Sequence, residues 1–534
     1  MPRHTGDTKA GSPGGACAAV IWHALIMTAA TNRGATERVR SLGVETTGIE
    51  IIGESERTAS PKDLFWPWFA ANISVFGISY AAFVLGFGIS FWQGVVVTLL
   101  GVIVSFLLCG IIAIAGKRGS APTMILSRAA FGVTGQKVPG VISWLVSIGW
   151  ETFLSIMAVL ATATIFDRLG WGGGTATKVI AAIVVAAMIV MASVAGYHII
   201  MKMQSYLTWI TGAITLLYVA MTVKDIDWAT VSAIPSGSFQ QTIGALVMVM
   251  TGFGLGWINI AADWSRYQRR DAAGGAIVAW NTIGGALAPS LLVCYGLALA
   301  GSDEKVASAI GGDPIGTLAT LLPTWVLVPF LIVAILSLVS GAVLGIYSSG
   351  LTLLSLGVRI PRPAAALVDG VILTLGTFYV VFVAQNFINP FQSFLITLGV
   401  PLAAWAGIMI ADIALRRRDY DDDALFDPRG IYGAWDWISI ATMAIFSVIG
   451  WGLVVNPFAA DASWNNWQGY LLEPLGLGTW NATDGYWEGN WAYANLGVLL
   501  ALVGSLLVTY VARRAKVRGQ ELARGHASYA PVNR

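Results

Sequence analysis

Two adjoining residues inside a long apolar segment, Trp150 and Glu151, have the clearest potential for chemistry in this sequence. An ionised carboxylate near the centre of a bilayer costs about 2.5–3.5 kcal/mol or more, so a carboxyl group in such a segment is a functional candidate by default. The Glu151 carboxyl can accept a hydrogen bond from a ring N–H or amino group of a ligand, or it can carry a proton. The alternative is a structural carboxyl that is hydrogen-bonded to a neighbouring helix.

A second tryptophan, Trp257, follows three alternating glycines, Gly252, Gly254 and Gly256. Two indoles can hold the two faces of a flat heterocycle, and base–aromatic stacking is worth about 1–3 kcal/mol per base. Packing is the competing interpretation, because the chain contains 22 tryptophans. A tryptophan in mid-span beside a glycine break is, however, less ordinary than one at the membrane interface.

Glycine-broken apolar segments occupy matching positions in the two halves of the chain, at 66–77 and 251–259. Irregular backbone inside lipid is tolerated only where it lines a cavity or is buried in protein. Paired interrupted helices therefore indicate the binding site of a secondary transporter. Asn72, Ser74 and Asn259 are polar side chains of these segments, and we expect them to contact substrate.

The composition indicates an all-α polytopic membrane protein, since 56% of the 534 residues are hydrophobic and 11% are charged, against about 25% charged residues in soluble domains. Apolar runs of about 20 residues, long enough to cross a bilayer, recur along the chain. The eighth run is too long for one straight span, and Pro401 predicts a kink in the tenth. We predict twelve spans, at 64–88, 91–116, 138–166, 178–198, 203–222, 240–262, 275–300, 323–356, 364–384, 388–415, 434–455 and 491–512.

The distribution of cations predicts the orientation. Counted from a cytoplasmic N-terminus, only four of the 31 Lys and Arg residues fall outside, namely Arg168, Lys178, Lys224 and Lys305. By the positive-inside rule, both termini are cytoplasmic, and we expect a multi-pass protein of the plasma membrane. The predicted parts are a disordered cytoplasmic tail (1–61), two five-helix units (62–222 and 240–415), two added helices (434–512) with an external loop (456–490), and a cytoplasmic tail (513–534).

Other functional classes find little support. The isolated cysteines Cys17, Cys109 and Cys294 predict neither a disulfide framework nor a metal site, and no cofactor is expected. A membrane enzyme would need convergent catalytic groups, for which Glu151 is the one candidate, and a channel would favour rings of charge. The net charge of +2 does not point to nucleic acid. The sequence does not indicate an oligomeric state.

Five motifs resemble the nucleobase:cation symporter-1 family, the purine–cytosine permeases, and they stand in the family's order between about 60 and 430. They are 68–74, 117–132, Gly149–Trp150, 261–267 and 347–357.

The resemblance implies an inverted repeat of five plus five helices, as in sodium-coupled amino-acid transporters, with two helices added and with spans one and six broken. It implies a cation-coupled symporter that imports a planar nitrogenous heterocycle, foremost cytosine or a purine, with allantoin, hydantoin, uracil or thiamine as alternatives. The ring would lie between Trp150 and Trp257, with spans one, three, six, eight and ten around it.

The sequence departs from the family at polar positions of this implied site. Leu154 stands where the family has an amide, and Gly341 and Gly345 stand where it has asparagine. Specificity for a base needs hydrogen bonds that leave wrong ligands with unpaired groups. Either the substrate differs, or Glu151, Asn72, Ser74, Asn259 and the backbone freed at Gly252, Gly254 and Gly256 supply the polar contacts.

The resemblance also implies a sodium site, formed by carbonyl groups of span one and by one carbonyl and two hydroxyl groups of span eight. The matching positions are Ala70, Ile73, Leu336, Val339 and Ser340. Val339 replaces one hydroxyl with a methyl group, and hard cations need oxygen ligands. The coupling ion is therefore left open between Na+ and a proton carried by Glu151.

Overall fold

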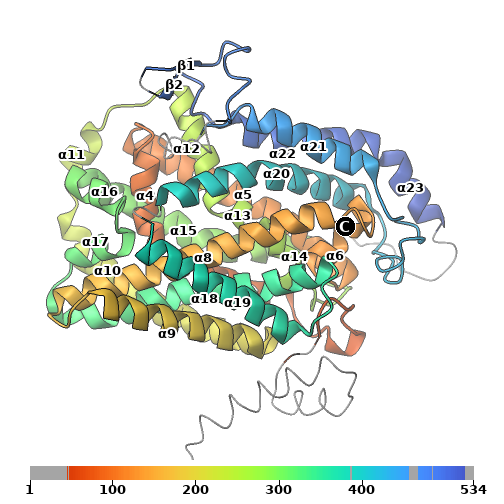
Figure 1. The fold of residues 1–534 in the computed structure, drawn as a ribbon, viewed down its shortest axis with the longest axis horizontal. Helices are drawn as coiled ribbons and strands as arrows, with labels where there is room; N and C mark the ends of the chain where they lie inside the picture. Colours follow the sequence, from red (N-terminus) through yellow and green to blue (C-terminus); the bar gives the residue numbers. More distant parts are fainter. Residues whose placement is uncertain (1–44, 46, 385–387, 456–466, 484, 524–534) are drawn as a thin grey trace, which may run out of the picture.

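Long helices lie side by side along the longest axis of the molecule in the computed structural model (Figure 1). The structure describes residues 45, 47–384, 388–455, 467–483 and 485–523. Apart from one two-stranded hairpin, the regular elements of these residues are helices.

The first half of the chain forms α3 (Phe65–Asn72), α4 (Phe76–Leu85), α5 (Phe91–Gly119), α8 (Lys137–Arg168), α9 (Thr175–Ala195) and α10 (Tyr197–Thr222). The second half forms α12 (Phe239–Gly252), α13 (Gly254–Trp257), α14 (Ala261–Ser265), α15 (Gly274–Ser302), α18 (Leu327–Ser355), α19 (Arg362–Phe382) and α20 (Ile388–Leu415). Then follow α21 (Trp437–Trp451), the strands β1 (Thr479–Asn481) and β2 (Tyr486–Glu488), α22 (Leu496–Ala512) and α23 (Arg514–Ala523).

Within the described residues, nine helices are long and apolar enough to cross a membrane, or up to eleven if each bent pair is one span. This agrees with a helical membrane protein. The predicted boundary between the fourth and fifth spans shifts, because Gly196 alone, with φ +97°, separates α9 from α10. The long eighth segment is a 3-10 turn, Thr324–Val326, followed by the continuous helix α18, and α20 runs through Pro401.

The first apolar segment is interrupted in its middle. Its two parts, Pro61–Asn72 and Phe76–Leu85, meet at an angle of 67°. The sixth is interrupted at Phe253, whose backbone (φ −117°, ψ −109°) is not helical and separates α12 from α13. Gly252 and Gly254 permit this arrangement, because a Cβ atom would collide with the Tyr80 ring at the first position and with the α5 backbone at the second.

The predicted disordered tail is wrong for its last part. Glu45 and residues 47–60 pack against the helix ends, and Ile52 is buried. Glu45 Oε1 lies 3.0 Å from Arg266 Nη2, and Tyr267 OH donates to the same carboxylate oxygen at 2.8 Å. Burial disfavours the Glu45 carboxylate, but Arg266 and Arg362 outweigh this and hold its pKa below the usual range. These partners, which are distant in sequence, order the segment; residues 1–44 and 46 lie outside the described residues.

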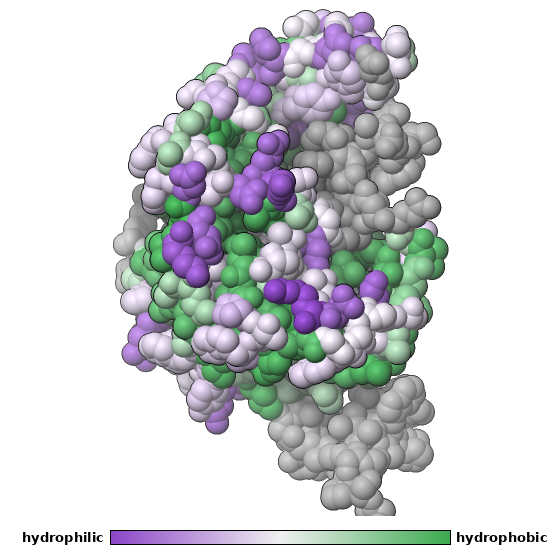
Figure 2. Space-filling view, turned by 90° about the vertical axis from the view of Figure 1, so that its left-hand side faces the viewer, coloured by the Kyte–Doolittle hydropathy of each residue, from purple (hydrophilic) through white to green (hydrophobic). Residues whose placement is uncertain are grey.

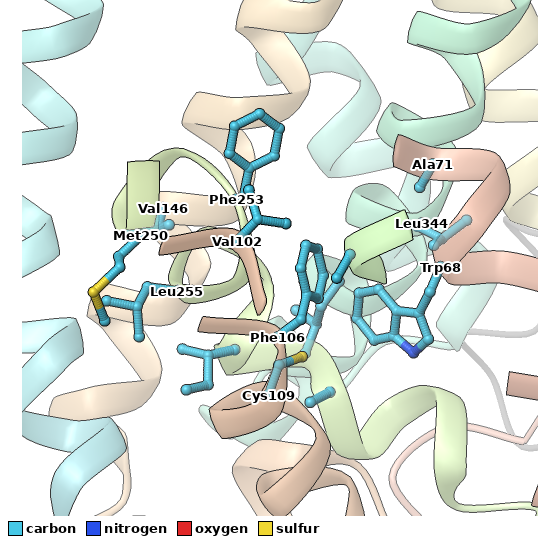
Figure 3. Close-up of a cluster of buried hydrophobic side chains, with 14 of the residues drawn as sticks. Trp68, Ala71, Val102, Phe106, Cys109, Val146, Met250, Phe253, Leu255 and Leu344 are labelled. Carbon is cyan, nitrogen blue, oxygen red and sulfur yellow. The ribbon is translucent and has the colours of Figure 1, made fainter. Parts of the chain in front are cut away.

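A large apolar core joins the broken segments to their neighbours (Figure 3). Trp68 packs edge-on against Phe106 of α5, with ring centroids 6.3 Å apart. The outer faces of α9 and α10 are apolar as well, as lipid contact requires, and between 62% and 71% of Ile180, Met191, Trp209 and Leu216 is exposed. One end of the molecule instead presents hydrophilic residues dispersed among hydrophobic ones (Figure 2).

Buried ion pairs fasten α20 to the C-terminal helices. Asp412 of α20 pairs with Arg416 at 2.6 Å and also with Arg513. Arg513 in turn lies 3.1 Å from Asp436, the residue that caps α21. All four side chains are almost wholly buried, so each charge depends on the others for compensation.

We expect Arg513→Gln to destabilise the protein by about 3–5 kcal/mol, because it leaves Asp412 and Asp436 short of a buried counter-charge. Arg514→Gln is the matched control, since the neighbouring Arg514 is exposed. The measurement is the temperature at which half of the detergent-solubilised protein is lost from its monodisperse size-exclusion peak. Equal temperatures for the two variants would show that the cluster does not stabilise this end of the fold.

Candidate binding site

A small pocket lies between α8, the α13 region and α18. It brings together seven residues of the site predicted from the sequence, namely Trp150, Glu151, Leu154, Gly256, Trp257, Asn259 and Gly345. The other lining residues are Ser147, Ile260 and Gly341. Side chains from distant segments therefore converge where the sixth apolar segment is interrupted.

Both tryptophans present part of their indole to this pocket. Trp150 stands edge-on to Phe153 at 5.8 Å, and Trp257 stands edge-on to Trp68 at 6.0 Å. Gly256 lets the Trp150 indole approach, since a Cβ atom at this glycine would lie 3.2 Å from Trp150 Nε1. Aromatic neighbours thus fix both rings, and a rigid ring is a favourable stacking surface.

Trp150 and Gly256 also line a second, apolar pocket. It lies toward α20, and Leu395, Gly399, Leu402 and Ala403 form its outer wall. The Trp150 indole thus borders both spaces.

Glu151 is completely buried, and neither carboxylate oxygen has a hydrogen-bond partner within the described residues. Its side chain fills the space beside Gly345, where an added Cβ atom would lie 2.7 Å from Glu151 Cγ. Gly345, one of the departures from the family pattern, therefore makes room for the Glu151 side chain. An unpartnered buried acceptor is costly, and a ligand that brings an N–H group would relieve that cost.

Asn259 supplies a second acceptor. Its Nδ2 donates to Ser143 Oγ at 2.9 Å and to Ser147 Oγ at 3.2 Å. With the amide fixed in this way, its Oδ1 is buried and has no partner in the described part of the chain. The serines that hold Asn259 were not predicted from the sequence.

Asn72 and Ser74 are not among the residues that line the pocket. Asn72 Nδ2 donates to Trp68 O at 2.8 Å, within α3. Ser74 Oγ lies 3.1 Å from Ser337 Oγ and joins the interrupted first segment to α18. In this arrangement both residues stabilise the break, and their predicted contact with substrate stays a prediction.

The residues of the implied cation site lie on α3, on the break that follows it and on α18, and these helices pack together. Ser340 Oγ donates to Gln204 Oε1 at 2.5 Å, and Gln204 Nε2 donates to Ser340 O at 3.1 Å. Val339 has no side-chain oxygen that could serve as a cation ligand. The predicted positions thus provide the carbonyl groups of Ala70, Ile73 and Leu336 and one hydroxyl group, which Gln204 of α10 orients.

A family model described as a permease for cytosine/purines, uracil, thiamine and allantoin matches residues 51–480. The chain belongs to this family. The resemblance inferred from the five motifs is thereby confirmed.

This permease is 24% identical, over 404 residues, to the putative purine-cytosine permease YxlA of Bacillus subtilis (strain 168), a match that covers 74% of this chain and 85% of YxlA. It is also 24% identical over 234 residues to the purine-cytosine permease FCY2 of Saccharomyces cerevisiae, with 43% of each chain covered.

Two solved structures show the same fold. Mhp1, a nucleobase-cation-symport-1 family transporter in a closed conformation with bromovinylhydantoin bound, matches with a TM-score of 0.65 at 19% identity, over 89% of this chain and 96% of Mhp1. A Na+-coupled sialic acid symporter in a substrate-bound outward-open state matches with a TM-score of 0.57 at 10% identity, over 98% of both chains. The permease therefore has a helical membrane transporter fold.

We expect Gly345→Ala to destabilise the permease by about 1–3 kcal/mol, since the added methyl group overpacks the space that Glu151 fills. In a Glu151→Ala background the same substitution should cost little, because the side chain that it meets is gone. Melting temperatures of the two single variants and the double variant measure this coupling. Gly341→Ala is the control, because the closest atom to its methyl group would be the flexible end of Leu154, at 3.1 Å, and its other neighbours would lie at ordinary contact distance. Equal losses from Gly345→Ala in both backgrounds would contradict the packing argument.

Proposed function

We propose that this chain is a cation-coupled symporter that imports a planar nitrogenous heterocycle, foremost cytosine or a purine nucleobase. The observation that carries the proposal is the pocket in which Trp150 and Trp257 meet two buried acceptors, Glu151 and Asn259 Oδ1, that have no partner among the described residues. Membership of the permease family supports transport rather than catalysis.

The acceptors define the kind of ligand. A carboxylate and an amide oxygen select a ring that carries N–H or amino donors on one edge, and they reject an isosteric ring that leaves them unpaired. Cytosine and the purines carry such an edge between two flat faces. Two relatives are named as purine-cytosine permeases. Allantoin, hydantoin, uracil and thiamine are the alternatives.

The proposed architecture is the one that the family resemblance implies. Twelve spans would comprise two inverted five-helix units and the added helices α21 and α22, with the first and sixth spans broken beside the substrate. The 67° bend after Asn72 and the non-helical backbone at Phe253 support the two breaks. The match to Mhp1 along 96% of that chain is consistent with this arrangement.

The proposed orientation places both termini in the cytoplasm and the β1–β2 hairpin outside. The cation bias of the loops supports it. Arg118 and Arg416 share contacts at one end of the helices, where Arg118 Nη1 donates to the carbonyl groups of Ile413 and Arg416. The plasma membrane is the proposed location.

We expect Trp257→Ala and Trp150→Ala each to weaken cytosine binding by about 1–3 kcal/mol, the typical worth of one stacked base. Trp→Phe at either position should lose less, because a smaller π-face remains. The measurement is the Kd of radiolabelled cytosine for the purified protein, with hypoxanthine, uracil, allantoin, hydantoin and thiamine as competitors. Trp325→Ala is the control, since that tryptophan is 72% exposed. Unchanged affinity in both alanine variants would refute the stacking arrangement.

The orientation can be tested by cysteine labelling of a variant in which the native cysteines are replaced by alanine. A membrane-impermeant maleimide should label Thr479→Cys, an exposed position of the hairpin, in intact cells. It should label Arg518→Cys, an exposed position of α23, only after the cells are permeabilised. The reverse pattern would overturn the proposed orientation.

A further inference from the structure

Glu45 and residues 47–60, called the strap below, cross one end of the helices. The C-terminal part of the strap runs directly into the interrupted first segment. It is also bonded to the end of the interrupted sixth segment, where Ala59 N donates to Tyr267 O at 3.2 Å and Ala59 forms a parallel β-bridge with Gln268. This part of the strap is therefore tied to both of the segments that carry a break.

The N-terminal end of the strap is bonded to a different group of helices. Glu45 N donates to Ala195 O, at the end of α9, at 3.4 Å, and Tyr197 N, at the start of α10, donates to Glu45 Oε2 at 2.5 Å. From α19, Arg362 Nε donates to Glu45 O at 3.1 Å. From α18, Tyr347 OH donates to Glu45 Oε1 at 3.1 Å. One residue of the strap thus contacts four helices that belong to neither broken segment.

The Glu45 carboxylate also holds the end of the sixth segment against α18. Arg266 Nη2 lies 3.0 Å from Glu45 Oε1 and donates to Tyr347 OH at 2.7 Å, while Arg266 Nη1 donates to Gly48 O of the strap at 2.7 Å. The Trp264 ring packs beside the Tyr347 ring, with centroids 5.2 Å apart. The side chains of Trp264, Arg266 and Tyr347 are completely buried, so the contact between the sixth segment and α18 is closed to solvent here.

This closed contact lies between the pocket and the strap. The pocket is lined by Asn259 and Ile260 of the sixth segment and by Gly345 of α18. Trp264 follows Ile260 by about one helical turn, and Tyr347 follows Gly345 by about half a turn. Two walls of the pocket therefore continue to the place where Trp264 and Tyr347 meet, and a path from the pocket between these walls must part the two side chains.

Glu45 brings a negative charge to two buried arginines. Arg266 forms an ion pair with the Glu45 carboxylate, and Arg362, which donates to the Glu45 backbone, has no ion pair within the described residues. Both arginine side chains are almost wholly buried. A buried charge that loses its partner is costly unless water reaches it. Departure of Glu45 and entry of water between the helices therefore favour each other.

We infer that the strap is a latch that keeps the pocket closed toward the cytoplasm, and that the pocket opens on this side when Glu45 leaves its partners. In secondary transporters, access alternates as one group of helices moves against another around a fixed site. The strap bridges the two broken segments to α9, α10, α18 and α19, so these groups stay together at this end while Glu45 is bound. The inference needs no particular substrate, and it takes only the orientation from the proposed function.

A cysteine between the pocket and the strap reports the opening. Ser348 is completely buried beside Tyr347, and Ser348→Cys is made in a protein whose native cysteines are replaced by alanine. In inside-out vesicles, we expect Glu45→Gln to raise the rate at which a membrane-impermeant methanethiosulfonate modifies this cysteine by about tenfold or more, because a neutral amide does not pair with Arg266 and the open form is more populated. Glu56→Gln, at an exposed carboxylate of the strap, is the matched control and should leave the rate unchanged.

The side from which the reagent acts separates a latch from general loosening of the fold. In right-side-out vesicles, the reagent should modify the Ser348→Cys protein no faster when Glu45→Gln is added. An unchanged rate from the cytoplasmic side would overturn the inference, because the path would have stayed closed without the ion pair. An equal rise from both sides would overturn it as well, since that result indicates loss of structure. A rise from the outer side alone would instead refute the proposed orientation.

Discussion

The constraint on which this structure depends is that lipid offers no hydrogen-bond partners, so polar groups within the bilayer must find them inside the protein. Asp412 pairs with two arginines, and the amide nitrogen of Asn259 donates hydrogen bonds to two serines. Glu151 does not meet this requirement within the described residues. The pocket is thus one place where the described interior leaves acceptor groups open, and a ligand with N–H donors would satisfy them.

Small residues make this arrangement possible, because they leave space that larger side chains of the pocket fill. Gly345 admits the Glu151 side chain, and Gly256 admits the Trp150 indole. At the break of the sixth segment, Gly254 lets the backbone approach α5. Close approach through small residues is the general solution for helix packing in membranes. Here the same solution places an acid and an aromatic ring where neighbouring helices would otherwise fill the space.

Local signals in the sequence predicted much of the site. The glycine break at 251–259, the mid-span tryptophans and the carboxyl at Glu151 can be recognised in the sequence alone, and they meet in one pocket, whereas the break at 66–77 does not line it. Gln204 was missed because its pairing with Ser340 depends on how two helices are rotated. The segment that follows Glu45 looked like a disordered tail because its stabilising partners, such as Arg266, lie more than 200 residues away.

Stacking and hydrogen bonding have separate consequences for selectivity in such a pocket. Indole faces accept flat rings with little discrimination, so Trp150 and Trp257 would add affinity for a whole class of heterocycles. Under the proposed function, discrimination would fall to Glu151 and Asn259, because Leu154 and Gly341 offer no polar side-chain group. A site polar on one edge distinguishes ligands by their donors at that edge and tolerates variation elsewhere. With no polar side chain at Leu154 and Gly341, recognition of substrate would then rest chiefly on Glu151, the acid beside Trp150.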